Sequence, residues 1–290
     1  MAYRDPQAIA MVGIESGETK ARLRWDKALV AGFLAGAYIA FAGLLAITVS
    51  AGLDPKTWGG VVTLLTGGVF TLGLVLVVIA GSELLTGNMA LIPLALLGRR
   101  ASIAGLFRNF WWVTIGNLAG SLFVAYFLAV KTGVVTTDIS LARLTTIATA
   151  KGVTESDWQI FLRAVGCNWL VCLAVWMALG AEDVGGKILA IFFPIMAFVA
   201  MGFDHVVANM FFLPAAIFAH VPNIGWGDTI RNWVFAFLGN LVGAAVFVAA
   251  AYWYLYVRVS PRDPRDVPPG DTTEEPDGRR FLGREAAGRR

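Results

Sequence analysis

Residues 81–93 read GSELLTGNMALIP, and residues 202–214 read GFDHVVANMFFLP. The two stretches share a Gly, an acid two residues later, Asn-Met at the eighth and ninth positions and a Pro at the thirteenth, at an offset of 121 residues (202 minus 81). Each lies inside a long apolar run and places an ionisable side chain where its neighbours have none. The sequence therefore predicts an internal repeat with a polar interruption in each half.

Composition identifies the class of protein. Hydrophobic residues make up 57% of the 290 residues and charged residues only 15%, more apolar surface than a soluble domain can cover. Six apolar regions reach the length of about 20 residues that a membrane crossing requires. They are 28–49, 61–97, 109–130, 159–180, 188–219 and 231–257.

The second and fifth regions exceed one crossing, and their polar residues fall near the middle. We therefore predict an all-α membrane protein with six transmembrane helices, of which helices two and five are interrupted. IGNLAGSLFVAYF (115–127) also resembles LGNLVGAAVFVAA (238–250), so each half contains three spans. Because three is an odd number of crossings, the 3+3 repeat is inverted, a transporter design in which unwound backbone lines a cavity.

Glycine pairs spaced by three residues should allow close helix packing. They are Gly32 and Gly36, Gly116 and Gly120, and Gly239 and Gly243.

Lys and Arg in the loops favour cytoplasmic termini, because bases gather in 1–27, in 98–108 and at the start of 258–290. We divide the chain into a cytoplasmic N-terminal segment (1–27), a membrane domain (28–257) and a cytoplasmic tail (258–290). The tail is rich in Pro, Gly and charge and is predicted to be disordered. The expected location is the cell membrane, with several crossings.

Near the middle of the spans lie three ionisable side chains, Glu83, Asp204 and His205, and such groups are functional candidates. A carboxylate would repel an anion, but it would be stabilised by the free N–H groups where a half-helix restarts. We therefore interpret Glu83 and Asp204 as structural caps. Imidazole can donate a hydrogen bond in either charge state, which makes His205 the pore candidate. The alternative is a histidine bonded only to Asp204 or to backbone.

Further polar and apolar residues near the interruptions have two readings each. The hydroxyl of Thr86 can donate to an anion, and Asn168 and Asn240 place amides in apolar spans, but all three residue types also join membrane helices. Five large apolar residues can either narrow a pore or simply pack: Phe70, Leu74, Leu84, Leu85 and Phe198.

Three motifs in order on this frame resemble those of the formate/nitrite transporter family. GSELLTGN (81–88) is similar to its first signature, GCNWLVCLA (166–174) to its second, and FDHVVANM (203–210) to its broken fifth helix with a central histidine. The similarity spans about 28–257. It implies an aquaporin-like channel domain over 28–257 and a homopentamer with one pore per protomer.

The resemblance also implies roles for single residues. Thr86 and His205 would form the central anion site, with Lys151 as a vestibule cation and Asn240 as a pore asparagine. The constriction would comprise Phe70, Leu74, Leu84, Leu85 and Phe198, although many members have Phe where this chain has Leu85. The residues given a structural role at the breaks are Glu83, Asp204, Asn88, Asn209 and Asn168.

The implied function is a channel or transporter for a small monovalent weak-acid anion, formate first, which passes with a proton at low pH because burying the neutral acid is cheaper than burying the charge. Nitrite and hydrosulfide are the alternatives. The expected partners are further copies of the chain, the anion and membrane lipid, with no nucleic acid, metal or cofactor.

Two other classes fit less well. A membrane enzyme would need a catalytic constellation, yet the chain has two histidines, His205 and His220, and no HExxH. A water or glycerol channel would carry paired NPA motifs, where this chain has Asn-Met-Ala at 88–90 and Asn-Met-Phe at 209–211.

Overall fold

The computed structural model describes residues 3–258. The chain begins with α1 (Pro6–Ala21), α2 (Trp25–Ser50), α3 (Pro55–Trp58), α4 (Gly60–Ile79) and α5 (Leu85–Leu97). It continues with α6 (Ile103–Phe123), the π-helical η1 (Val124–Val130), α7 (Asp138–Thr149), the π-helical η2 (Ala150–Thr154) and α8 (Asp157–Gly180). The last elements are α9 (Val184–Ala200), α10 (Val206–Phe218), α11 (Trp226–Ala244), η3 (Ala245–Ala250) and α12 (Ala251–Tyr256).

Five helical stretches in the described chain are long and apolar enough to cross a membrane, which confirms a multi-pass membrane protein. They are Trp25–Ser50, Gly60–Ile79, Ile103–Val130, Asp157–Gly180 and Trp226–Tyr256. The shorter apolar helices are α5, α9 and α10. The predicted spans 61–97 and 188–219 are each divided into two helices, α4 with α5 and α9 with α10.

The two breaks have the same backbone geometry. Gly81 and Gly202 follow the ends of α4 and α9 with φ values of 81° and 72°, a left-handed conformation that glycine adopts without strain. The next residue then bonds back into the helix in both cases, from Ser82 N–H to the carbonyl of Val77 and from Phe203 N–H to that of Phe198, each at 3.0 Å. Both helices therefore end in the same glycine-dependent turn.

Glycine brings pairs of long helices into backbone contact, as predicted. A Cβ on Gly36 of α2 would lie 2.0 Å from the carbonyl oxygen of Asn117 in α6. A Cβ on Gly239 of α11 would lie 2.3 Å from the carbonyl oxygen of Phe161 in α8. The α2–α6 and α8–α11 pairs thus leave no room for a side chain at these positions.

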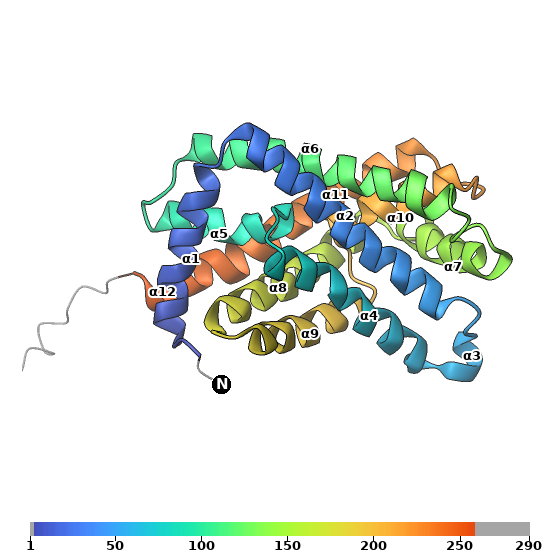
Figure 1. Ribbon diagram of the computed structural model, residues 1–290, viewed down its shortest axis with the longest axis horizontal. Coiled ribbons are helices and arrows are strands. Elements are labelled where there is room, and N and C mark those ends of the chain that lie inside the picture. Colours follow the sequence, from blue (N-terminus) through green and yellow to red (C-terminus); the bar gives the residue numbers. More distant parts are fainter. Residues whose placement is uncertain (1–2, 259–290) are drawn as a thin grey trace, which may run out of the picture. The chain divides into compact units, whose positions relative to one another are not determined.

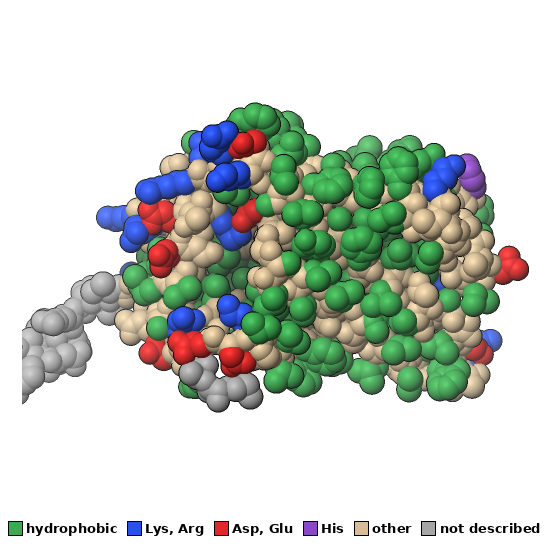
Figure 2. Space-filling model, in the orientation of Figure 1, with side chains coloured by type: hydrophobic (Ala, Val, Ile, Leu, Met, Phe, Trp, Pro, Cys, Tyr) green, Lys and Arg blue, Asp and Glu red, His purple; other side chains and the backbone are tan. Residues whose placement is uncertain are grey.

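Charged side chains on the surface lie mainly near one end of the helices, and apolar side chains lie along their length. Figure 1 shows α1, α12 and the α5–α6 connection at one end, and α3, α7 and the α10–α11 connection at the other. On the face drawn in Figure 2, Lys, Arg, Asp and Glu gather at the α1 end, and apolar side chains cover the stretch beyond it. Composition alone predicted neither α1 nor α7. Helix α1 packs on α5 and α8. The predicted tail lies, after Arg258, outside the described residues.

Candidate functional site

An asparagine holds the start of α5 in place. The Leu85 N–H donates to Asn117 Oδ1 at 3.0 Å. Asn117 Nδ2 donates in turn to the carbonyls of Gly32, at 2.8 Å, and Glu83, at 2.9 Å. One buried amide therefore satisfies backbone groups that the break leaves unpaired.

Asn240 holds the start of α10 in the same way. It accepts from Val206 N–H at 2.9 Å and donates to the carbonyls of Ala164, at 2.8 Å, and Asp204, at 2.9 Å. Because its amide is fully engaged with backbone, Asn240 positions the break in this structure, and its role as a pore asparagine stays a prediction. Asn117 and Asn240 occupy the same position in the matching stretches 115–127 and 238–250, so the repeat in the sequence already pointed to Asn117.

Glu83 lies in a half-buried ion pair at the first break. Its Oε1 accepts from Lys20 Nζ of α1 at 2.7 Å, and its Oε2 accepts from Asn88 Nδ2 at 2.8 Å. Asn88 also donates to Asn109 Oδ1 at 2.8 Å, and Asn109 donates to the Lys20 carbonyl at 2.9 Å. The four side chains form a closed network.

The second break repeats this network. Asp204 Oδ1 accepts from Lys151 Nζ at 3.0 Å and from Asn209 Nδ2 at 2.8 Å. Asn209 then donates to Asn232 Oδ1 at 2.8 Å, and Asn232 to the Lys151 carbonyl at 3.1 Å. Three members of these networks, Lys20, Asn109 and Asn232, had no sequence signal that set them apart.

The predicted capping contacts are absent among the described residues. Leu84 precedes α5 without a side-chain cap, and the side chain that caps α10 is His205. Each carboxylate instead bonds a lysine and an asparagine, because a buried charge is best balanced by a cation with further hydrogen bonds. The lysines are therefore paired, with side chains 18% exposed for Lys20 and 12% for Lys151.

His205 links the two halves. Its Nδ1 accepts from Ala208 N–H at 3.1 Å, and its Nε2 lies 2.8 Å from Thr86 Oγ1. Because a backbone N–H can only donate, Nδ1 has no hydrogen and the ring hydrogen is on Nε2. Asn168 supports the same junction by donating to the carbonyls of Thr86, at 3.2 Å, and Asn240, at 2.8 Å. The predicted pair Thr86 and His205 is thus brought together, with Thr86 fully buried.

Three cavities lie along the junction of the halves. The Lys151 cavity, about 240 Å³, is lined by Arg143, Lys151, Glu155, Arg163 and His205 among others. The Lys20 cavity, about 480 Å³, is lined by Lys20, Lys27, Glu83, Leu84 and Lys187 among others. A narrow cavity of about 10 Å³ shares His205 with the first and Leu84 with the second. This volume is about that of one water-sized probe.

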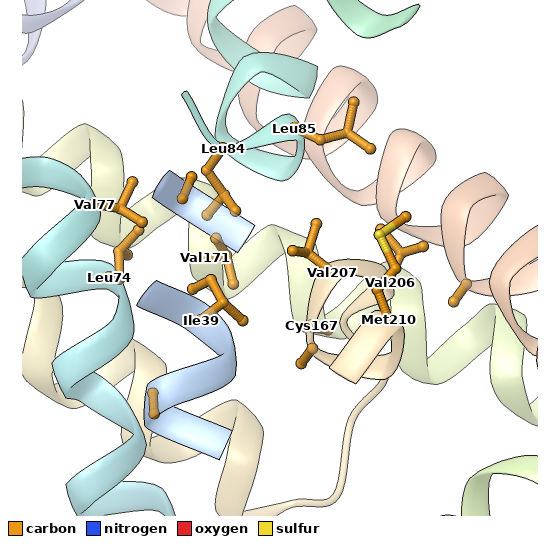
Figure 3. Packing of buried hydrophobic residues seen from close by; sticks show 14 of the residues in the cluster. Ile39, Leu74, Val77, Leu84, Leu85, Cys167, Val171, Val206, Val207 and Met210 are labelled. Atoms are coloured by element: carbon orange, nitrogen blue, oxygen red, sulfur yellow. The ribbon is translucent and has the colours of Figure 1, made fainter. Parts of the chain in front are cut away.

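The narrow cavity is lined mostly by apolar side chains. Its lining residues are Ile39, Phe70, Leu74, Leu84, Val171, Ile195, Phe198 and His205. Figure 3 shows Ile39, Leu74, Leu84 and Val171 close together, and Leu85 turned away from them. Four of the predicted constriction residues thus border the cavity. Leu85 is buried elsewhere, since the residue after Leu84 in the first turn of α5 points to another side of the helix.

Comparisons with known proteins identify the family. Residues 7–254 match the family model described as formate/nitrite transporter. The chain is 48% identical to the "Probable formate transporter" of Methanothermobacter thermautotrophicus, over 89% of this chain and 98% of that protein. It is 44% identical to the "Formate channel BtFdhC" of Bacillus thuringiensis, over 88% of this chain and 97% of that protein.

A solved structure described as "Pentameric formate channel with formate bound" is similar with a TM-score of 0.72. It is 31% identical to this chain, and the match covers 81% of this chain and 98% of that one. The match with the family model covers both breaks and both lysine networks described above. The chain belongs to the formate/nitrite transporter family.

Proposed function

We propose that the chain is a membrane channel for formate, and that the anion passes through the Lys151 cavity, the narrow cavity and the Lys20 cavity in turn. The observation that carries this proposal is the sequence of cavities, in which two cavities with cations flank an apolar one bordered by His205. The relatives named for formate support the choice of anion.

The architecture that we propose has six crossings in an inverted 3+3 repeat. The α4–α5 and α9–α10 pairs each make one crossing, and the matched networks at Glu83 and Asp204 relate the two halves. We further propose a homopentamer with one pore per protomer, supported by the pentameric similar structure. Both termini are cytoplasmic in this proposal, so the Lys151 cavity opens to the outside.

The chemistry follows from the dryness of the narrow cavity. An anion that moves from the Lys151 cavity into the narrow cavity loses its hydration water, and the apolar walls offer almost no hydrogen bonds in exchange. Burying the charged anion there is therefore costly, whereas burying the neutral acid is not. Formate therefore crosses together with a proton that it takes from water in the flanking cavities. The Nε2 hydrogen of His205, which faces Thr86 Oγ1 in this structure, is the hydrogen-bond donor that the anion reaches, and this hydrogen stays on the ring.

Flux into proteoliposomes tests the function. Formate, nitrite and hydrosulfide are compared at equal concentration and at two pH values, with glycerol swelling as a control for a neutral-solute pore. We expect formate to be carried fastest, and each flux to rise at the lower pH. Glycerol swelling without anion flux would contradict the proposal.

Nitrite is the second candidate substrate, because the family model covers both anions. Both are small, monovalent and derived from weak acids. A nitrite flux well above that of formate in the same vesicles would assign the chain to nitrite.

A further inference from the structure

The Lys151 cavity is lined by a buried carboxyl group that neither the sequence motifs nor the transport path above uses. Glu155 directly follows η2, is only 5% exposed and lines this cavity. Its Oε1 accepts a hydrogen bond from Arg163 of α8, and its main-chain carbonyl accepts one from Arg231 of α11. The other carboxyl oxygen, Oε2, has no hydrogen-bond partner among the described residues.

Asp204 has a matching oxygen. Its Oδ1 is engaged by Lys151 and Asn209, while Oδ2 is buried and without a hydrogen-bond partner among residues 3–258. The carboxyl groups of Glu155 and Asp204 are close enough for each to influence the titration of the other, and Lys151 acts on both. Two buried carboxylates that close repel when both are ionised, and a proton between them relieves the repulsion and satisfies both oxygens.

We propose that Glu155 and Asp204 hold one proton between Glu155 Oε2 and Asp204 Oδ2, and that this proton controls how strongly the Lys151 cavity attracts an anion. The inference rests on the proposed function, because the anion enters by this cavity. Burial and then the charge of Asp204 raise the pKa of the Glu155 carboxyl to about 7, against the opposing charges of Lys151 and Arg163. The proton is therefore gained and lost near neutral pH.

Because few charges surround the Glu155–Asp204 pair, one proton changes the net charge of the Lys151 cavity strongly. The cations that face it are Lys151 of η2, Arg163 of α8 and, across the cavity, Arg143 of α7, with Arg231 of α11 on the Glu155 carbonyl. Around the cavity, Arg143, Lys151 and Arg163 give three positive charges, against two negative charges when both carboxyl groups are ionised. Binding one proton doubles the net charge from one to two, which concentrates anions in the cavity.

The test is the variant Glu155→Gln, which imitates the protonated state. The amide oxygen can still accept from Arg163, and the amide nitrogen can donate to Asp204 Oδ2, so folding should be preserved. Formate flux of the variant is divided by that of the unmodified protein, at equal pH on both sides of the vesicle, which cancels the protonation of formate in bulk water. We expect a ratio near one at about pH 5.5 that rises toward about tenfold at about pH 8, one unit above the pKa.

The control is Asp138→Asn, which removes an exposed carboxylate at the start of α7. Its flux ratio should not change with pH. A ratio for Glu155→Gln that is equally independent of pH would overturn the inference.

Infrared titration of the unmodified protein supplies a readout that needs no transport. A protonated-carboxyl C=O band should disappear between about pH 6 and about pH 8, a window centred on the pKa, and should be missing from Glu155→Gln. Absence of a titrating band in the unmodified protein would overturn the shared proton. If no formate is carried at all, the proposed function fails, while this titration still decides whether the proton is held.

Discussion

His205 caps α10 and contacts Thr86, and the neutral form of its ring serves both roles. Its Nδ1 caps α10 while its Nε2 faces Thr86, so a ring with hydrogens on both nitrogens would place a donor against the Ala208 N–H. Adding a proton to the ring therefore breaks the cap. The neutral imidazole is the form that this break stabilises.

We predict that His205→Asn keeps the fold and alters transport. Asparagine caps helices well and retains a donor, but its shorter side chain cannot place that donor where the Nε2 hydrogen of His205 lies. Formate flux should therefore fall throughout the range between about pH 5 and about pH 8, in which an unperturbed histidine would titrate, while expression and oligomer size change less. The matched control is His220→Asn, since His220 is exposed with φ 58°, a conformation that asparagine tolerates. An unchanged flux for His205→Asn would reduce this histidine to a helix cap.

The paired carboxylates predict a stability effect. Asp204→Asn removes the buried carboxylate that Lys151 and Asn209 bond, and breaking such an ion pair costs about 3–5 kcal/mol. Thermal unfolding in detergent should show a clear decrease, and Glu83→Gln should show a smaller one because that pair is more exposed. The double variant Lys151→Met with Asp204→Asn should recover part of the loss. Normal stability with a changed anion preference would show that Asp204 selects the anion directly.

Glu155 predicts how stability depends on pH. Its pKa is raised to about 7 in the folded protein, so between its ordinary range and about 7 the folded state holds a proton that the unfolded chain has released. This contribution is fully present below the ordinary pKa and is lost as pH rises through the folded value. The melting temperature of Glu155→Gln minus that of the unmodified protein should therefore grow from about pH 5 to about pH 8. A difference that is constant over this range contradicts the assignment.

At the scale of helices, matched asparagines and glycines hold the backbone of the two breaks in place. Asn117 and Asn240 each make three hydrogen bonds to backbone around a break. They reach those groups because α6 and α11 approach their partner helices so closely at glycine. Helix packing and break geometry are therefore one device, used twice.

A single methyl group should disturb this device. In Gly36→Ala the new Cβ would lie 2.0 Å from the main-chain carbonyl oxygen of Asn117. The side-chain amide of Asn117 is the group that positions α5, so a shift of Asn117 would also move α5. Overpacking of this kind costs about 1–3 kcal/mol, so both thermal stability and flux should fall. Gly60→Ala is the control, because nothing lies within 4 Å of its added Cβ. Equal behaviour of the two variants would mean that α2 and α6 can separate freely.

Sequence reasoning found the breaks but not the networks around them. The breaks are local, since Gly, the acid and Asn-Met occur within a dozen residues and repeat. The partner of Glu83 is Lys20, 63 positions away on α1, and nothing in a composition profile distinguishes this lysine from its neighbours. The burial of Glu155 depends on α8 and α11, so only the assembled fold reveals it. The roles that the resemblance implied for Thr86 and His205 stay predictions, while Asn240 is engaged with backbone and Leu85 does not border the narrow cavity.

At the scale of the whole molecule, large apolar side chains remain exposed along the helices, as expected for a surface that faces lipid or other subunits. We predict that the protein is a homopentamer. Native mass spectrometry in lipid nanodiscs should give five copies, and Asp138→Asn should leave that number unchanged. A stable monomer or dimer in both mild detergent and lipid would contradict the prediction.

The smallness of the narrow cavity has a consequence for the cell as well as for the anion. Protons hop along continuous files of hydrogen-bonded water, so an open wet hole would discharge the gradient that drives ATP synthesis. A cavity of about 10 Å³ bordered by Phe70, Leu74, Leu84 and Phe198 holds about one water and offers it few partners, which interrupts the file. In the pathway that we propose, these four side chains block proton conduction through water, and a proton crosses only when it is bound to the transported anion as the neutral acid.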